Sequence, residues 1–271
     1  MSARGRFVSV LVAIVTALAG FVAVGALPAA AAPRAVQYVA LGDSYAAGTA
    51  AGSSPDDCKQ NTTGAYPALL VVGSRIDLQA NDACSGATTS DVVANQLSEL
   101  NSDTRLVTLT VGAANLDLSG LLTVCTTQPP DICQIEIIKR IALLPELGSD
   151  LTGLYAKVAE AAPRARVVVT GYPHLFEPIN PLFASINAAI DQLNSTIEQA
   201  VSVANDADVN IHYVDVVAEF AGHGIGGTVP PPFIFPPGVP IEAFHPTPAG
   251  YSAYANAISV ALPGGWLKQL V

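Results

Sequence analysis

The sequence predicts a three-layer α/β/α fold with a central, mostly parallel five-stranded sheet. Short apolar runs rich in β-branched residues alternate with stretches of helical character, and the runs end at glycine, aspartate or a turn. Buried parallel strands form such continuous apolar runs because helices cover both faces of their sheet. The expected strands are Val36–Leu41, Arg75–Gln79, Leu106–Val111, Arg166–Thr170 and Val209–Val214.

Six stretches between and after these strands are expected to be helical. They are Ala65–Val72, Thr89–Leu100, Ile135–Leu144, Asp150–Ala161, Phe183–Val203 and a last helix from about Thr247 to Ala261. The segment Gly224–Pro240 interrupts the alternation, because its many prolines fix the backbone and remove hydrogen-bond donors. We expect a stiff loop there, whose apolar residues could cover a pocket or could pack on the surface.

Residues 1–32 have the pattern of a signal peptide. Two arginines precede an apolar run from Phe7 to Leu27, and a row of alanines follows it. The run is long enough to span a membrane, so an uncleaved anchor is the alternative. The alanines favour cleavage near Ala32. We therefore expect a secreted chain in which residues 33–271 form a single domain, without stable membrane insertion after cleavage.

The charge and cysteine content limit the possible partners and ligands. The formal net charge of −10 disfavours nucleic acid, and nothing indicates an obligate protein partner, so we expect a monomer. An even number of cysteines in an exported chain indicates disulfides. Cys125 and Cys133 enclose a short proline-containing loop and are expected to pair, which leaves Cys58 with Cys84. A zinc site is the alternative, but the cysteine spacing does not favour it.

The segment after the first expected strand carries a candidate nucleophile. Gly42-Asp43-Ser44 ends this strand and leads into a loop. Ligands of open parallel sheets bind beyond the carboxyl ends of the strands, where a serine hydroxyl could attack a substrate. Serine after a strand is also a common helix cap, so the tripeptide alone is compatible with both roles.

A candidate base lies near the other end of the sequence. His245 directly precedes the last expected helix, and Glu242 lies three residues before it. A histidine that titrates near neutral pH can take the proton of a serine hydroxyl. Glu242 could orient the imidazole by accepting a hydrogen bond from its other nitrogen, or it could be a surface carboxylate in a loop.

Together these segments resemble the GDSL, or SGNH, hydrolase family, in its secreted actinobacterial branch of esterases and lipases. Gly42-Asp43-Ser44 is similar to the first block of the family, Cys84-Ser85-Gly86 to the second, and Phe244-His245-Pro246 to the last. The resemblance covers roughly residues 36–262. It implies a flavodoxin-like fold, Ser44 as nucleophile, His245 as base, and the backbone N–H groups of Ser44 and Gly86 as donors to the oxyanion.

The third block departs from the family pattern. It usually reads Gly-x-Asn-Asp, and its asparagine donates to the oxyanion, whereas here Gly112 is followed by Ala113-Ala114-Asn115. An alignment without a gap puts Ala114 at the asparagine position, and one inserted residue restores Asn115 as the donor. Loss of one such donor costs about 10²–10³ in rate. Asn115 is therefore either the third donor or a residue that only caps the following turn.

Other catalytic motifs are absent or out of context. The sequence contains no Gly-x-Ser-x-Gly elbow, no His-Glu-x-x-His and no Walker A motif. Gly222–Gly227 matches Gly-x-Gly-x-x-Gly but runs into prolines instead of a helix. His212 lies in an expected strand, whereas His174 follows one and could line the site. We expect no metal and no cofactor.

The resemblance implies hydrolysis of carboxylic esters, either small molecules or lipids, through an acyl-enzyme on Ser44. Two alternatives remain open on the sequence. An acyltransferase or ring-forming enzyme would use the same acyl-enzyme, and a water-poor pocket under the loop at 224–240 would favour it. A weakly active or non-catalytic binding protein on the same scaffold would account for the altered third block.

Overall fold

A five-stranded parallel sheet lies at the centre of the protein. The computed structural model describes residues 35–54, 56–238 and 243–262. The strand order is β2-β1-β3-β4-β5, and all four pairings are parallel, which confirms the predicted sheet. The predicted signal peptide and its cleavage point lie outside the described residues. The strands are β1 (Val36–Gly42), β2 (Ile76–Asn81), β3 (Leu106–Thr110), β4 (Arg166–Thr170) and β5 (Ile211–Val214).

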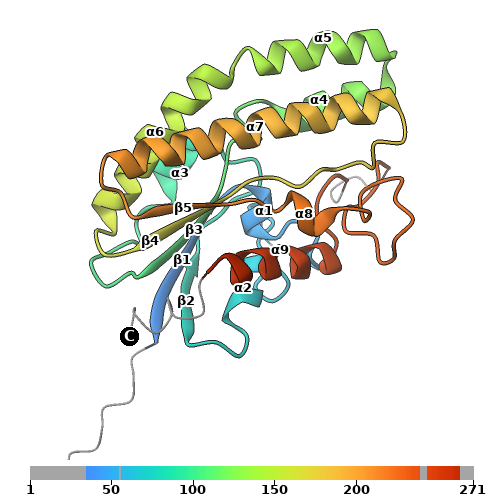
Figure 1. Cartoon of the computed structure of the whole chain (residues 1–271). Coiled ribbons are helices and arrows are strands. Elements are labelled where there is room, and N and C mark those ends of the chain that lie inside the picture. Colours follow the sequence, from blue (N-terminus) through green and yellow to red (C-terminus); the bar gives the residue numbers. More distant parts are fainter. Residues whose placement is uncertain (1–34, 55, 239–242, 263–271) are drawn as a thin grey trace, which may run out of the picture. The chain divides into compact units, whose positions relative to one another are not determined.

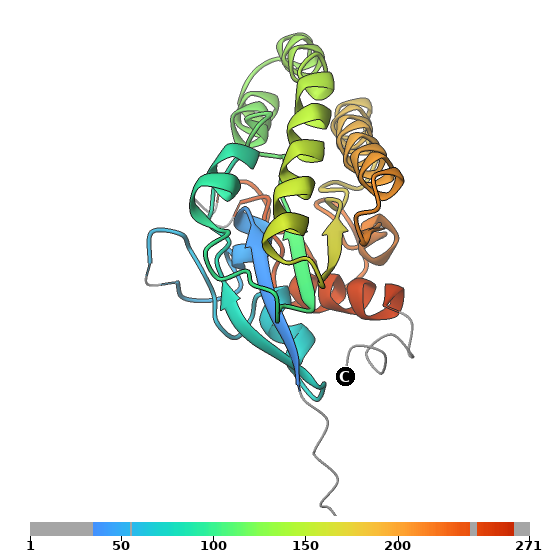
Figure 2. The same ribbon diagram turned by 90° about the vertical axis from the view of Figure 1, so that its left-hand side faces the viewer.

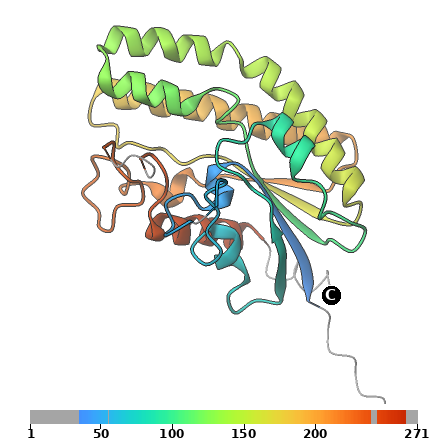
Figure 3. The ribbon, with the colours of Figure 1, turned by 180° about the vertical axis from the view of Figure 1, so that it is seen from behind.

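Helices cover both faces of the sheet, as predicted (Figure 1). On one face α3, α6 and α7 pack together, and α4 and α5 continue this layer outward, whereas α2 and α9 pack on the other face. Views from the side and from behind show the same division (Figures 2 and 3). The helices are α1 (Ser44–Ala47), α2 (Tyr66–Val71), α3 (Thr89–Asn95), α4 (Leu118–Thr127), α5 (Pro130–Ile141), α6 (Leu144–Ala161), α7 (Pro181–Asp206), α8 (Val217–Phe220) and α9 (Pro248–Ala261).

Three helices begin earlier than the sequence predicts, for a common reason. Pro130, Pro145 and Pro181 each lie in the first turn of a helix, where the missing N–H has no intrahelical partner to lose. The sequence does not predict α4 at all. Its start is fixed by the side chain of Asp117, which accepts a hydrogen bond from the N–H of Gly120 at 3.2 Å.

Both predicted disulfides are present. Cys58 and Cys84 are joined with an S–S distance of 2.01 Å, and Cys125 is joined to Cys133, which ties α4 to α5. Since all four sulfurs are paired, the cysteines form no zinc site. Among residues 35–54, 56–238 and 243–262, no helix has the length and apolar character needed to cross a membrane.

The carboxyl ends of the central strands meet at one edge of the sheet. Gly42 at the end of β1 lies beside Thr110 at the end of β3, and Asp43 N donates to Thr110 O at 2.8 Å. Thr110 in turn shares a buried hydrogen bond with Thr170 at the end of β4 (2.6 Å). The segments that follow these three strands therefore start side by side, as expected for a ligand site in an open parallel sheet.

Candidate active site

Ser44 is the first residue of the short helix α1, directly after β1. The cap of this helix is Asp43, whose side chain accepts a hydrogen bond from Tyr45 N at 3.0 Å. Ser44 is thus not the cap residue, which leaves its hydroxyl available for another role. Among the described residues, no hydrogen bond engages Oγ of Ser44.

The turn before Ser44 is held by a glutamine that the sequence analysis does not single out. The side chain of Gln96 is buried and hydrogen bonds both backbone groups of Gly42: Oε1 accepts from its N–H at 2.8 Å, and Nε2 donates to its carbonyl at 2.9 Å. Gly42 has φ +132°, in the region that favours glycine. A glutamine at the end of a helix carries no sequence signal for such a distant contact, so only the fold reveals it.

Asp43 is a buried carboxyl that holds the nucleophile segment in place. Besides Tyr45 N, it accepts a short hydrogen bond from the hydroxyl of Tyr172, which itself accepts from Ala113 N at 3.1 Å. Burial raises the pKa of Asp43 to about 7, although these hydrogen bonds work in the opposite direction. Tyr172 thereby links the segments that follow β1, β3 and β4.

His245 is carried by a short antiparallel pairing with the proline-rich loop. Phe235 N donates to His245 O at 3.0 Å, and Phe244 N donates to Phe235 O at 2.9 Å. One turn further, Thr247 N donates to Phe233 O at 2.8 Å, and Thr247 then caps α9. The loop therefore positions the backbone of His245 through hydrogen bonds. The sequence analysis expected it either to cover a pocket or to pack on the surface, and neither expectation includes this role.

A direct contact links the neighbours of Ser44 and His245. The hydroxyl of Tyr45 donates to Phe244 O at 2.8 Å, and the Tyr45 ring lies 5.6 Å from the His245 ring between centroids. Phe244 has φ +64°, which is unusual for a residue with a side chain. This hydrogen bond holds the strained residue next to the histidine in place.

The imidazole of His245 is oriented by a backbone carbonyl. Nδ1 lies 3.1 Å from Ala243 O, and because a carbonyl can only accept, Nδ1 carries the proton and Nε2 presents a lone pair. Burial lowers the pKa of His245 to about 4, so the imidazole is neutral at neutral pH. Glu242, expected from the sequence to orient His245, lies outside the described residues.

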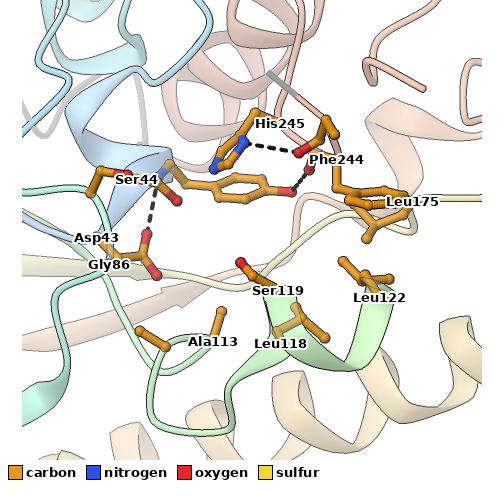
Figure 4. Close-up of a pocket in the computed structure, with 14 residues that line it drawn as sticks. Asp43, Ser44, Gly86, Ala113, Leu118, Ser119, Leu122, Leu175, Phe244 and His245 are labelled. Atoms are coloured by element: carbon orange, nitrogen blue, oxygen red, sulfur yellow. Dashed lines mark hydrogen bonds between the residues drawn. The ribbon is translucent and has the colours of Figure 1, made fainter. Parts of the chain in front are cut away.

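Ser44 and His245 line one pocket of about 130 Å³ (Figure 4). The opposite ends of the sequence thus supply a hydroxyl and a neutral imidazole to the same cavity. Apolar side chains form much of its wall, and Ser85 and Ser119 add further hydroxyl-bearing residues. The lining residues are Asp43, Ser44, Tyr45, Ser85, Gly86, Ala113, Ala114, Leu118, Ser119, Leu122, Leu175, Ala243, Phe244 and His245.

Two backbone N–H groups are available at this pocket. Ser44 is the first residue of α1, so its N–H has no partner within that helix. Gly86 has φ +83° and open space where a side chain would begin. In the described part of the chain, neither N–H has a hydrogen-bond acceptor. The Cys58–Cys84 disulfide and the bond from Cys84 N to Gly42 O (3.0 Å) hold the Gly86 segment beside β1.

Asn115, one of the two candidates for the third donor position, does not line this pocket in the described structure. Its side-chain oxygen accepts from Thr89 N at 3.0 Å, and its amide nitrogen donates to Thr89 Oγ1 at 2.9 Å. Both polar atoms of the Asn115 side chain therefore hydrogen bond Thr89, the first residue of α3, and Asn115 connects its own loop to the start of that helix. Ala114, the residue before it, lines the pocket instead, as the alignment without a gap implies.

The other histidines lie elsewhere. His174 contacts Asp191 at 2.7 Å, His212 is exposed on the edge strand β5, and His223 stacks on Phe233 with ring centroids 3.9 Å apart. None of them, His174 included, is among the residues that line the pocket in the described structure.

Comparison with known proteins identifies the family. Residues 40–253 match the GDSL-like Lipase/Acylhydrolase family. The chain is similar to a lipase from Streptomyces rimosus, with 37% identity over 84% of this chain and 88% of the relative. Two crystal structures are similar to it. The first is an extracellular lipase from Streptomyces rimosus, with 34% identity, a TM-score of 0.76, and coverage of 84% of this chain and 100% of the other. The second is phospholipase A1 from Streptomyces albidoflavus NA297, with 35% identity, a TM-score of 0.74, and coverage of 83% of this chain and 99% of the other. The chain belongs to the GDSL-like lipase/acylhydrolase family and is a carboxylic ester hydrolase.

Proposed function

We propose that this protein is a secreted lipase or esterase in which Ser44 is the nucleophile and His245 is its base. The observation that carries the proposal is that these two residues, from opposite ends of the chain, line one pocket, with the imidazole already in the tautomer that a base requires. Secretion is supported by the leader pattern, by the two disulfides and by the similarity to an extracellular lipase.

In the first half of the reaction, Ser44 Oγ attacks the carbonyl carbon of the ester, and Nε2 of His245 takes the hydroxyl proton. The Ala243 carbonyl then accepts a hydrogen bond from the imidazolium and stabilises its positive charge. The tetrahedral intermediate collapses as His245 returns the proton to the departing alkoxide. An alcohol leaves, and the acyl group remains on Ser44.

The N–H groups of Ser44 and Gly86 hold the oxyanion that forms in each half of the reaction. In the second half, water attacks the acyl carbon while His245 takes its proton. His245 then returns this proton to Ser44 Oγ as the bond to the acyl carbon breaks, which releases the carboxylic acid and restores the Ser44 hydroxyl. With both N–H groups free in the described structure, no rearrangement of existing hydrogen bonds is needed to receive the oxyanion.

The pocket favours an ester with a short or medium apolar acyl group. Leu118, Leu122, Leu175 and Phe244 form its apolar wall. Its volume of about 130 Å³ is close to that of an engineered cavity of about 150 Å³ that holds benzene. A longer chain would extend beyond it toward solvent. The similarity to a lipase and to a phospholipase A1 supports lipid esters as substrates.

Neither alternative raised by the sequence gains support. A water-poor pocket under the proline-rich loop would favour acyl transfer, but no described residue between 224 and 238 lines the pocket. The binding-protein hypothesis rested on the altered third block, and the similarity over the whole domain is to named lipases. We therefore retain hydrolysis by water as the reaction.

A serine-directed fluorophosphonate tests the nucleophile. We expect one covalent adduct on Ser44, located by mass spectrometry of the digested protein, together with loss of hydrolysis of p-nitrophenyl butyrate. Heat-unfolded protein should remain unlabelled, since the reaction needs the neutral imidazole next to the hydroxyl. Labelling at another serine, or no labelling with no hydrolysis of short-chain esters, would reject the proposed chemistry.

The pH dependence of kcat/KM tests the base. Only neutral His245 can take the proton, so activity should fall as pH decreases through the pKa of about 4, rather than near the ordinary value of 6.5. The profile is measured from pH 3 to 8, with circular dichroism to verify folding at each pH. Asp43→Asn removes the other carboxyl or imidazole group that lines the pocket. The fall in kcat/KM at acidic pH should stay at the same pH in this variant. A midpoint near 6.5 in both proteins would show that the imidazole is not desolvated as inferred.

A further inference from the structure

We infer that the hydroxyl of Ser119 donates a hydrogen bond to the oxyanion, as a third donor beside the N–H groups of Ser44 and Gly86. The inference rests on the proposed function of the pocket and adds a residue to it. Ser119 lies in the first turn of α4, a helix that the sequence does not predict, so the sequence analysis could not place it near Ser44.

The position of Ser119 within the pocket supports this role. Figure 4 shows its hydroxyl directed into the cavity from below His245, with Ala113 near it and Gly86 next to Asp43 on the left of the view. An oxyanion donor must point into the cavity from a position other than that of the base, because the base occupies one side of the attacking hydroxyl. The nearby wall residues Ala113 and Ala114 carry only methyl groups, so their side chains cannot donate.

The hydroxyl of Ser119 is also free to donate. Its neighbours in α4 use their hydroxyls within the helix: Thr123 donates to Ser119 O at 2.9 Å, and Thr126 donates to Leu122 O at 2.8 Å. In the described structure, no hydrogen bond engages Oγ of Ser119 itself. A hydroxyl that rotates about one bond can aim its proton at a charge that develops in the cavity.

The start of α4 is fixed firmly enough to position this hydroxyl. Asp117 caps the helix and forms an ion pair with Arg140 of α5 at 2.9 Å. The Cys125–Cys133 disulfide joins the same two helices at their other end. Ser119 is therefore carried by an anchored helix and not by a free loop, as placement of a donor requires.

The chemistry explains why such a donor matters here. The asparagine that usually donates from the third block is replaced by Ala114, and Asn115 is bound to Thr89. A hydroxyl from the next turn can supply the lost hydrogen bond to the same developing charge. Because Ser119 is exposed to solvent, its contribution should be at or below that of a buried amide donor, or about 10- to 100-fold in kcat.

An isosteric pair of variants separates the hydroxyl from the shape of its side chain. Ser119→Thr keeps the hydroxyl, and Ser119→Val has the same shape without it. With p-nitrophenyl butyrate we expect kcat of the valine variant to be about 10- to 100-fold below that of the threonine variant, with KM within about twofold, because the interaction exists mainly in the transition state. The rate of phosphonylation of Ser44 should fall in parallel.

The controls keep the two proposals distinct. Thr123→Val removes a hydroxyl from the same helix outside the pocket and should behave as the unaltered protein, with an unchanged Tm. Equal kcat for the threonine and valine variants, while Ser44 is still labelled, would overturn the role of Ser119 and leave the proposed function intact. Absence of Ser44 labelling in the unaltered protein would instead reject the proposed function.

Discussion

Replacing Ser44 by alanine is expected to lower kcat for ester hydrolysis by about 10⁴- to 10⁶-fold. The acyl-enzyme cannot form without the hydroxyl, so only the binding and oxyanion groups remain to assist direct attack by water. The protein should still fold, because Oγ of Ser44 makes no hydrogen bond in the described structure. Initial rates with p-nitrophenyl butyrate and thermal melts of both proteins measure the two effects.

Ser252→Ala is the matched control for this variant. Ser252 is exposed on α9, where its hydroxyl donates only to Pro248 O at 3.0 Å. It should retain full activity. If the Ser44 variant kept more than about one hundredth of the activity after purification to a single mass, an acyl-enzyme on Ser44 could not be the main route.

Gly42→Ala is expected to have the largest effect on folding. A Cβ at this position would lie 2.1 Å from Thr110 O, and φ +132° is strained for any residue with a side chain. Strain and overpacking together should cost about 3–5 kcal/mol of unfolding free energy. For a domain of this size, Tm should fall by about 10 °C. Thr110 O accepts the hydrogen bond from Asp43 N, so the nucleophile segment should also shift and activity should fall.

Gly73→Ala is a control that distinguishes the cost of a positive φ from the cost of a steric clash of the new Cβ. Gly73 also has a positive φ, +67°, but no atom lies within 4 Å of the position of its Cβ. This variant should lose only about 1 kcal/mol, the cost of the backbone conformation, and should retain full activity. If both variants melted within about 2 °C of the unaltered protein, the close approach of β1 and β3 at Gly42 would not be the constraint described above.

The layers of the fold could be predicted because the strands are short, apolar and nearly fully buried. Val36–Gly42 and Leu106–Thr110 contain few polar residues. Such continuous apolar runs indicate parallel strands that helices cover on both faces. Helix starts were less predictable. Pro130, Pro145 and Pro181 lie in the first turns of helices that begin before the predicted ranges.

The sequence predicts those residues of the candidate site that stand in motifs of known chemistry. Ser44, Gly86 and His245 stand in recognisable motifs, and the pocket contains all three. Their supports were not predictable. Gln96 and Tyr172 act through contacts between residues 54 and 129 positions apart, and the orientation of His245 comes from a backbone carbonyl, which every residue possesses.

In the proposed mechanism, the late position of His245 in the sequence determines when activity can arise during synthesis. A chain emerging from its N-terminus presents Ser44 early, but the residue that would activate it, the loop that carries that residue and α9 emerge much later. Tyr251 of α9 closes the arrangement by donating to Thr49 O at 2.7 Å, just after the nucleophile. Unfinished or prematurely terminated chains therefore lack a complete catalytic pair.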